Sequence, residues 1–95
     1  MTVYTYILHC SDNTYYTGIT RDLVRRLNEH RKGRCRYTKT RLPLSVVFKS
    51  ENEGYKLAAQ LERQIKNVGA KKFMLRSAKQ IIVNSTGLNS FISAL

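Results

Sequence analysis

Two short tyrosine segments near the start of the chain are the first candidates for chemistry. Tyr4-Thr5-Tyr6 and Tyr16-Thr17-Gly18 each lie in a run of aromatic and β-branched residues. Such runs favour strands, and a hairpin between them can bring Tyr6 and Tyr16 close together. Strand tyrosines usually pack, with the hydroxyl at the rim of the core. Two adjacent phenols could instead take part in proton transfer, so their neighbours decide between these interpretations.

Arg26 and His30 stand four residues apart in the next segment. On a helix they project from one face, offset from Leu23 and Leu27. A planar cation beside an imidazole suits the stabilisation of a phosphate and the movement of a proton. Two structural alternatives stay open. Asp22, four residues before Arg26, could simply pair with it, and His30 could be an ordinary surface histidine.

Glu62 is the last acidic residue of the chain, and every charged residue after it is basic. It lies beside the apolar positions Ala58 and Ile65 of a predicted helix, so partial burial is expected. An isolated carboxylate among cations can serve as a salt-bridge acceptor. It is equally the hard oxygen ligand that Mg²⁺ selects, with waters completing the coordination.

The charge is strongly unbalanced. Seventeen Lys and Arg against six Asp and Glu give +11 and a pI near 10.1, and nine of the cations fall within residues 21–41. Such an excess favours a polyanionic partner over a merely solvated surface. The loop cations are expected to contact phosphates without reading bases, and Tyr37 either stacks on an unpaired base or packs under the loop. The predicted nucleic-acid contacts are Arg31, Lys32, Arg34, Arg36, Tyr37, Lys39 and Arg41.

The pattern predicts the elements that position these residues. Residues 3–8 and 15–20 form a hairpin through Ser11-Asp12-Asn13, and Thr20 caps a helix over about 21–31 with a stripe of Leu23, Val24 and Leu27. A basic loop, a third strand at 44–49 and a helix from Gly54 to Gly69 follow, then a shorter helix over 70–82. Leu57, Ala58, Leu61, Ile65 and Val68 supply the apolar stripe of the second helix. The expected fold is α+β, a small three-stranded antiparallel sheet flanked by two or three helices.

Length and composition indicate a single domain over residues 1–95. No linker, repeat, signal peptide or run of about 20 apolar residues is visible, so no membrane association is expected. Two cysteines, Cys10 and Cys35, are too few for a disulfide scaffold and favour reduced thiols in a cytoplasmic protein.

These motifs together resemble the GIY-YIG nuclease superfamily, in particular its small single-domain bacterial members related to the nuclease domain of UvrC. Tyr4-Thr5-Tyr6 matches the first motif and Tyr16-Thr17-Gly18 the second, with Arg26 ten residues after Tyr16. The likeness spans residues 3 to about 72 and is supported by 36–38 (Arg-Tyr-Thr) and 62–66 (Glu-Arg-Gln-Ile-Lys). The sequence departs from the family at Tyr4, where glycine is usual, and at Thr5 and Thr17, where isoleucine is usual. The asparagine that many members carry after the glutamate has only Asn84 and Asn89 as candidates.

The resemblance implies metal-dependent hydrolysis of nucleic-acid phosphodiesters, with DNA the favoured substrate. Glu62 would hold one Mg²⁺, for which Mn²⁺ can substitute, and Arg26 would bind the phosphate oxygens. Tyr6 is the favoured base, with Tyr16 as its partner, although the two roles could be reversed. Neighbouring cations would lower the tyrosine pKa, and His30 could relay the proton.

Three other functions remain as alternatives. A non-catalytic nucleic-acid-binding module on the same fold would bind without cutting. A zinc module would use His9, Cys10, His30 and Cys35, whose spacing matches no tetrahedral zinc pattern. A membrane-surface protein would need an aromatic-rich apolar helix face that the sequence lacks. A protein partner or a homodimer could supply site specificity.

Overall fold

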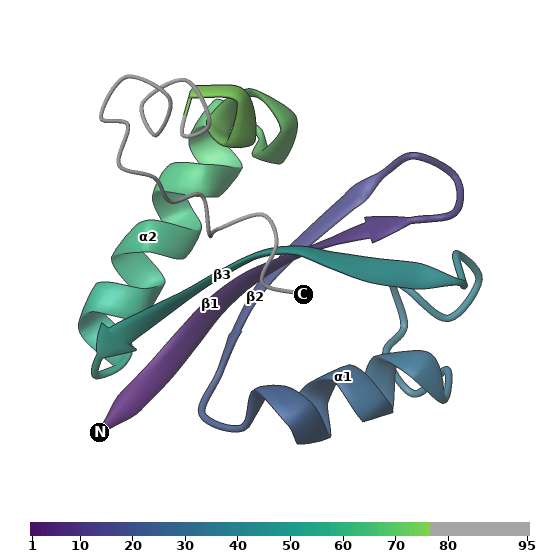
Figure 1. The fold of residues 1–95 in the computed structure, drawn as a ribbon, viewed down its shortest axis with the longest axis horizontal. Coiled ribbons are helices and arrows are strands. Elements are labelled where there is room, and N and C mark those ends of the chain that lie inside the picture. The colour runs from purple at the N-terminus through teal and green to yellow at the C-terminus, as the bar shows by residue number, and fades with distance from the viewer. Residues whose placement is uncertain (77–95) are drawn as a thin grey trace, which may run out of the picture.

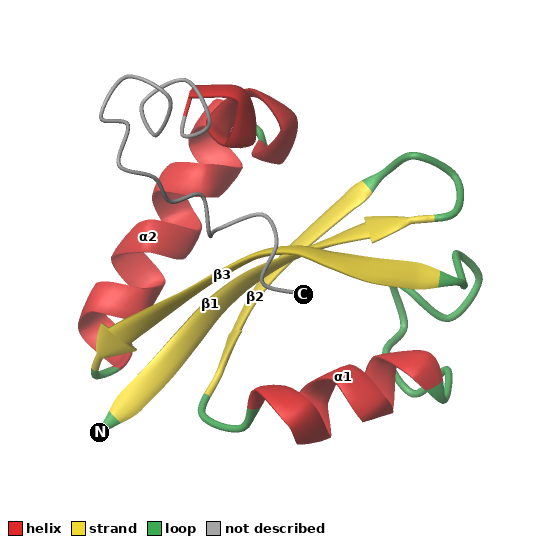
Figure 2. Cartoon of the chain, in the orientation of Figure 1, coloured by secondary structure: helices red, strands yellow, loops and turns green. Residues whose placement is uncertain are grey.

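A computed structural model describes residues 1–76 of the chain. Its elements are β1 (Thr2–Cys10), β2 (Tyr15–Thr20), α1 (Leu23–Arg31), β3 (Leu44–Glu53) and α2 (Tyr55–Val68), followed by helical residues 70–76 (Figures 1 and 2). The predicted helix over 70–82 is therefore confirmed at its start, and the rest of it lies outside the described residues. The strands form an antiparallel sheet in the order β2-β1-β3, which confirms the expected α+β fold.

The two longer helices cover opposite faces of the sheet (Figure 1). Alternation along β1 directs Tyr6 and Leu8 toward α1, where Leu23 and Leu27 pack, and directs Ile7 toward α2, where Ile65 packs. Two small cores result, one on each side of the sheet. Tyr6 belongs to the first of them, so this candidate site residue is also a packing residue.

A β-bulge in β3 lets this one strand contribute side chains to both cores. Ile7 pairs with Phe48 and Leu8 pairs with Val46, so Val47 is the extra residue. Without it, Val46 and Phe48 would share a face. With it, Val46 packs in the α1 core and Phe48 in the α2 core.

Thr5 is one of the departures from the family pattern, and its burial has a clear structural basis. The side chain is fully buried, and its hydroxyl donates to the Ala58 carbonyl at 3.1 Å. The Asn52 amide donates to the same Thr5 oxygen at 3.0 Å. Thr5 therefore ties β1 to α2 by hydrogen bonds at a position where isoleucine would give packing alone.

Several predicted details are wrong. Asp22, not Thr20, caps α1, because its carboxylate accepts from the Arg25 amide while the Thr20 hydroxyl accepts from the Asp22 amide. Val24 and Leu57 were placed on buried stripes but are 72% and 49% exposed. The third strand continues four residues past its predicted end. Within residues 1–76 no helix is long and apolar enough to cross a bilayer.

Candidate active site

Tyr6 and His30 meet between β1 and the last turn of α1. The Tyr6 hydroxyl lies 3.1 Å from His30 Nε2, and both side chains are fully buried. His30 is therefore not a surface histidine, and it lies beside Tyr6 in the core.

Thr38 holds the other side of this imidazole. Its hydroxyl oxygen lies 2.8 Å from His30 Nδ1. Both ring nitrogens are thereby hydrogen-bonded, Nδ1 to Thr38 and Nε2 to Tyr6. Burial, together with the nearby Arg26 charge, lowers the pKa of His30 to about 4, so the ring is neutral at physiological pH.

The Tyr6 phenol is held in its protonated form. Burial raises its pKa to about 12, although a hydrogen bond from Arg26 opposes that shift. The expectation that neighbouring cations lower the pKa of this tyrosine is wrong, because desolvation of the phenolate outweighs them. Tyr6 is consequently poorly suited to be a base.

Gly18 makes room for Tyr6. The two residues face each other across β1 and β2. A Cβ on Gly18 would lie 2.7 Å from the Tyr6 hydroxyl oxygen and 2.9 Å from Cζ, well inside van der Waals contact. The glycine of the second motif is therefore explained by the ring that it must accommodate.

Tyr16 lies on the same face of the sheet, in β2 at its free edge, and is half-buried. Its ring centroid is 6.2 Å from that of Tyr6 and 5.0 Å from that of His30. The predicted proximity of the two tyrosines is confirmed. Unlike Tyr6, Tyr16 retains access to solvent.

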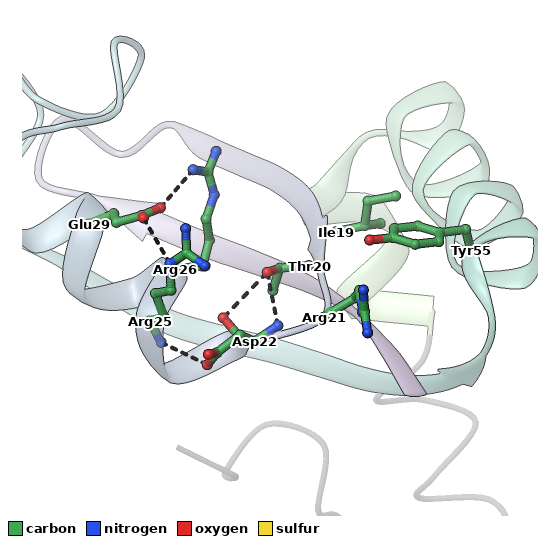
Figure 3. Close-up of a pocket in the computed structure, with 8 residues that line it drawn as sticks. All are labelled: Ile19, Thr20, Arg21, Asp22, Arg25, Arg26, Glu29 and Tyr55. Atoms are coloured by element: carbon green, nitrogen blue, oxygen red, sulfur yellow. Dashed lines mark hydrogen bonds and ion pairs between the residues drawn. The ribbon is translucent and has the colours of Figure 1, made fainter. Parts of the chain in front are cut away.

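Arg26 reaches this cluster from α1. Hydrogen bonds to Tyr6 and to Glu29 raise the pKa of its guanidinium, so it stays charged. Its Nη1 lies 3.0 Å from Glu29 Oε1 (Figure 3). Asp22 is occupied in capping the helix, so the pairing proposed for it with Arg26 does not form. Glu29 takes that place, and its spacing of three residues from Arg26 is the sequence signal for this pair.

Glu62 approaches β2 from the other side of the sheet. The N-terminal end of α2 borders one cavity at this edge, where Tyr55 lies with Ile19 and Arg26. Its C-terminal end borders a second, where Lys66 lies with Tyr16. Glu62 is four residues before Lys66 and shares its helix face. Its carboxylate is 24% exposed and lies 3.2 Å from the Lys66 ammonium.

Comparison with known proteins identifies this arrangement. A family model described as the GIY-YIG catalytic domain matches residues 2–75. The chain belongs to the GIY-YIG family. It is 45% identical over 67 residues to a UPF0213 protein of Listeria monocytogenes, covering 70% of this chain and 75% of that one. It is 33% identical over 85 residues to a UPF0213 protein of Natronomonas pharaonis, covering 88% and 94%. The solution structure of a UPF0213 protein from Bacillus halodurans aligns with a TM-score of 0.49 and 31% identity over 92% of this chain and 88% of that one.

Membership of the GIY-YIG family assigns a nuclease-type function, and nucleases of this family generally use a divalent metal. Glu62 fits such an ion, because it offers a partly exposed hard oxygen donor and Mg²⁺ often takes one or two carboxylates plus waters. In residues 1–76 no three His, Cys, Asp or Glu side chains are grouped to hold a metal. The zinc alternative also conflicts with His30, whose two ring nitrogens are already hydrogen-bonded.

The basic loop of this GIY-YIG domain divides into two groups of cations. Arg41 stabilises the loop, because it pairs with Asp12 at 3.0 Å and stacks on the Tyr37 ring at 4.1 Å. Tyr37 in turn packs 5.6 Å from Tyr16 and remains 39% exposed. The other predicted contacts are exposed and make no ion pair within the described part of the chain: Arg31, Lys32, Arg34, Arg36 and Lys39. Asn84 and Asn89 lie outside the described residues.

Proposed function

We propose that this GIY-YIG domain is a metal-dependent endonuclease that hydrolyses phosphodiester bonds of DNA. The observation that carries the proposal is that Tyr16 and Arg26 both adjoin Tyr6 on the α1 face of the sheet. On the α2 side, Glu62 pairs with Lys66, which borders a cavity together with Tyr16. A substrate strand along β2 would then meet a phenol, a guanidinium and a carboxylate.

Arg26 binds the non-bridging oxygens of the scissile phosphate. Its charge is fixed, and its planar fork matches two oxygens of a phosphate. Glu29 holds the guanidinium before substrate arrives. Negative charge that develops on the phosphate would then be stabilised by a donor already in place, which is an efficient form of electrostatic catalysis.

Tyr16 is the residue that orients the attacking water and, as phenolate, takes its proton. This reverses the order favoured from the sequence. Tyr6 is buried, protonated and hydrogen-bonded to His30, whereas Tyr16 is half-buried in the edge strand β2. Tyr6 and His30 form the wall against which Tyr16 packs, and Tyr6 helps to hold Arg26 in place.

Glu62 holds the divalent ion, and Lys66 must release its carboxylate for that purpose. A bound Mg²⁺ or Mn²⁺ would supply Lewis-acid stabilisation of the phosphate and of the leaving oxygen. The exposed loop cations hold the strand by its phosphates, which gives affinity without base specificity.

The test is a cleavage panel. Single-stranded, duplex and branched DNA, with RNA for comparison, are incubated with the protein in Mg²⁺, Mn²⁺ or EDTA. We expect internal cuts in DNA in the presence of either metal and none in EDTA. A folded protein that binds every substrate and cuts none would reject the enzyme in favour of the binding module.

A further inference from the structure

A cavity of about 350 Å³ lies beside Arg26, along one face of α1 from its N-terminus to Glu29. It is formed where the end of β2, the first turns of α1 and the start of α2 meet (Figure 3). We call it the Arg21 pocket, and its lining residues are Ile19, Thr20, Arg21, Asp22, Arg25, Arg26, Glu29 and Tyr55.

The Arg21 pocket contains one guanidinium that pairs with no acidic group in the described residues, that of Arg21. Glu29 pairs with both Arg25 and Arg26, and Asp22 accepts from the backbone of α1. Arg21 is exposed and makes no ion pair or hydrogen bond through its side chain within residues 1–76. A free guanidinium next to a catalytic one is a suitable ligand for a second phosphate.

Tyr55 gives the pocket an aromatic wall. It is 49% exposed, and its ring lies alongside Ile19 with no aromatic or hydrogen-bonding partner in the described residues (Figure 3). An exposed ring beside arginines is the usual composition of a surface on which a nucleotide packs.

The position of the pocket relative to the loop is the decisive point. Arg26 lines the pocket and also contacts Tyr6, so the pocket is continuous with the reaction centre. The basic loop begins after Arg31, at the C-terminal end of the nine-residue helix. At 1.5 Å per residue the two ends of this helix are about 13 Å apart, which is about four base pairs along the axis of a duplex.

We infer that the Arg21 pocket binds the nucleotide that flanks the scissile phosphate on the side opposite to the basic loop. Arg21 contacts the phosphate of that nucleotide, and Tyr55 packs on its sugar or base. This inference rests on the proposed nuclease function and adds a binding site to it. A strand held on both sides of Arg26 is cut internally rather than from an end.

The experiment measures binding in EDTA, so that it does not depend on cleavage. The pocket variant is Arg21→Gln with Tyr55→Leu, and the matched control is Arg63→Gln, which removes an exposed arginine on the outer part of α2. Fluorescence anisotropy is recorded for a labelled DNA oligonucleotide shortened in steps from its 5′ or its 3′ end. Each variant is also titrated with salt.

We expect the pocket variant to bind the full oligonucleotide at least about tenfold more weakly, because it loses both a stacking contact and a phosphate contact. Its slope of log K against log salt should decrease by about 1. Shortening from one end should weaken the wild type and Arg63→Gln but have no further effect on the pocket variant.

Equal affinities for the pocket variant and Arg63→Gln would overturn the inference. So would a pocket variant that loses as much affinity as the wild type when the oligonucleotide is shortened. If the wild type binds in this pattern but never cuts, the nuclease proposal fails and the pocket stands. Thermal melting serves as the control for folding, since both substituted side chains are exposed.

Discussion

Thr38 Oγ1 lies 2.8 Å from Nδ1 of His30, and this contact joins the basic loop to the core of the candidate active site. Both side chains are fully buried. His30 in turn hydrogen-bonds the Tyr6 hydroxyl, which Arg26 also contacts. The loop that is expected to bind phosphates is thereby coupled to the guanidinium that is expected to bind the scissile one.

Thr38→Val should reduce the cleavage rate about tenfold and lower the free energy of unfolding by about 1–3 kcal/mol. The reason is that the buried Nδ1 of His30 then lacks its hydrogen-bonding partner. Thr38→Ser retains the hydroxyl and should restore most of both quantities. Steady-state kinetics and denaturant unfolding check this. A Thr38→Val protein with wild-type kinetics would show that His30 needs no support from the loop.

Acid should destabilise the protein through His30. Its pKa is about 4 in the fold against an ordinary value of 6.5, so only the unfolded chain takes up a proton between these values. The free energy of unfolding should therefore decrease as the pH falls through this range, by up to about 3 kcal/mol. Carboxyl groups whose pKa the fold lowers, such as Glu29, further decrease the free energy of unfolding only below about pH 4.5.

Denaturant unfolding at a series of pH values measures this dependence. His30→Gln is the matched variant, because its side chain does not titrate. Its stability should be lower overall but nearly independent of pH between 6.5 and 4.5. A wild-type protein equally stable at both ends of that interval would mean that His30 is protonated in the fold.

Gly18→Ala should destabilise the protein by about 1–3 kcal/mol, the usual cost of an overpacked position. The added methyl would lie 2.7 Å from the Tyr6 hydroxyl oxygen. Because the clash is with Tyr6, combining Gly18→Ala with Tyr6→Phe should cost less than the sum of the single changes. A double-mutant cycle in denaturant checks this, and strict additivity would place the strain elsewhere.

The sequence was most informative where local patterns decide the structure. The hairpin, the helix that ends at Gly69 and the proximity of Tyr6 to Tyr16 follow from alternation, turn residues and motif spacing. The capping by Asp22 was missed because Thr20, Asp22 and their neighbours all suit a helix start, and only the backbone geometry selects one.

Features that depend on burial and long-range contact were not predictable. The bulge at Val47 depends on how two cores share one strand. The role of Thr38 depends on a loop that folds back onto α1. The raised pKa of Tyr6 reflects complete desolvation, which the sequence does not reveal, whereas the nearby arginines that oppose this shift are evident in it.

Tyr16→Phe should reduce the cleavage rate by at least about 10²-fold, the scale of one general base. Tyr6→Phe should reduce the rate less and the stability more, because the Tyr6 hydroxyl is a buried hydrogen-bonding partner of His30. Arg26→Ala should resemble Tyr16→Phe in rate. Single-turnover cleavage and thermal melting separate these effects. A Tyr6→Phe variant slower than a stable Tyr16→Phe variant would return the role of base to Tyr6.

Glu62 and Lys66 give the clearest test of the metal site. The two side chains form an ion pair at 3.2 Å, and only one of them is expected to hold the metal. Glu62→Gln should abolish cleavage in Mg²⁺ while DNA binding stays equal or becomes slightly tighter, since one negative charge is lost and the volume is kept.

Lys66→Gln is the matched variant, because it breaks the same ion pair from the other side. The pair is partly exposed, so neither change should lower stability much. With the ammonium removed, the Glu62 carboxylate is free for the cation, and half-maximal cleavage should need less Mg²⁺ than in the wild type. Metal titrations of the cleavage rate for both variants measure this, with DNA anisotropy in EDTA as the control for binding. If both variants lose activity together, the ion pair is the functional unit and Glu62 does not hold the metal. If Glu62→Gln cuts at the wild-type rate, the carboxylate has no part in the reaction.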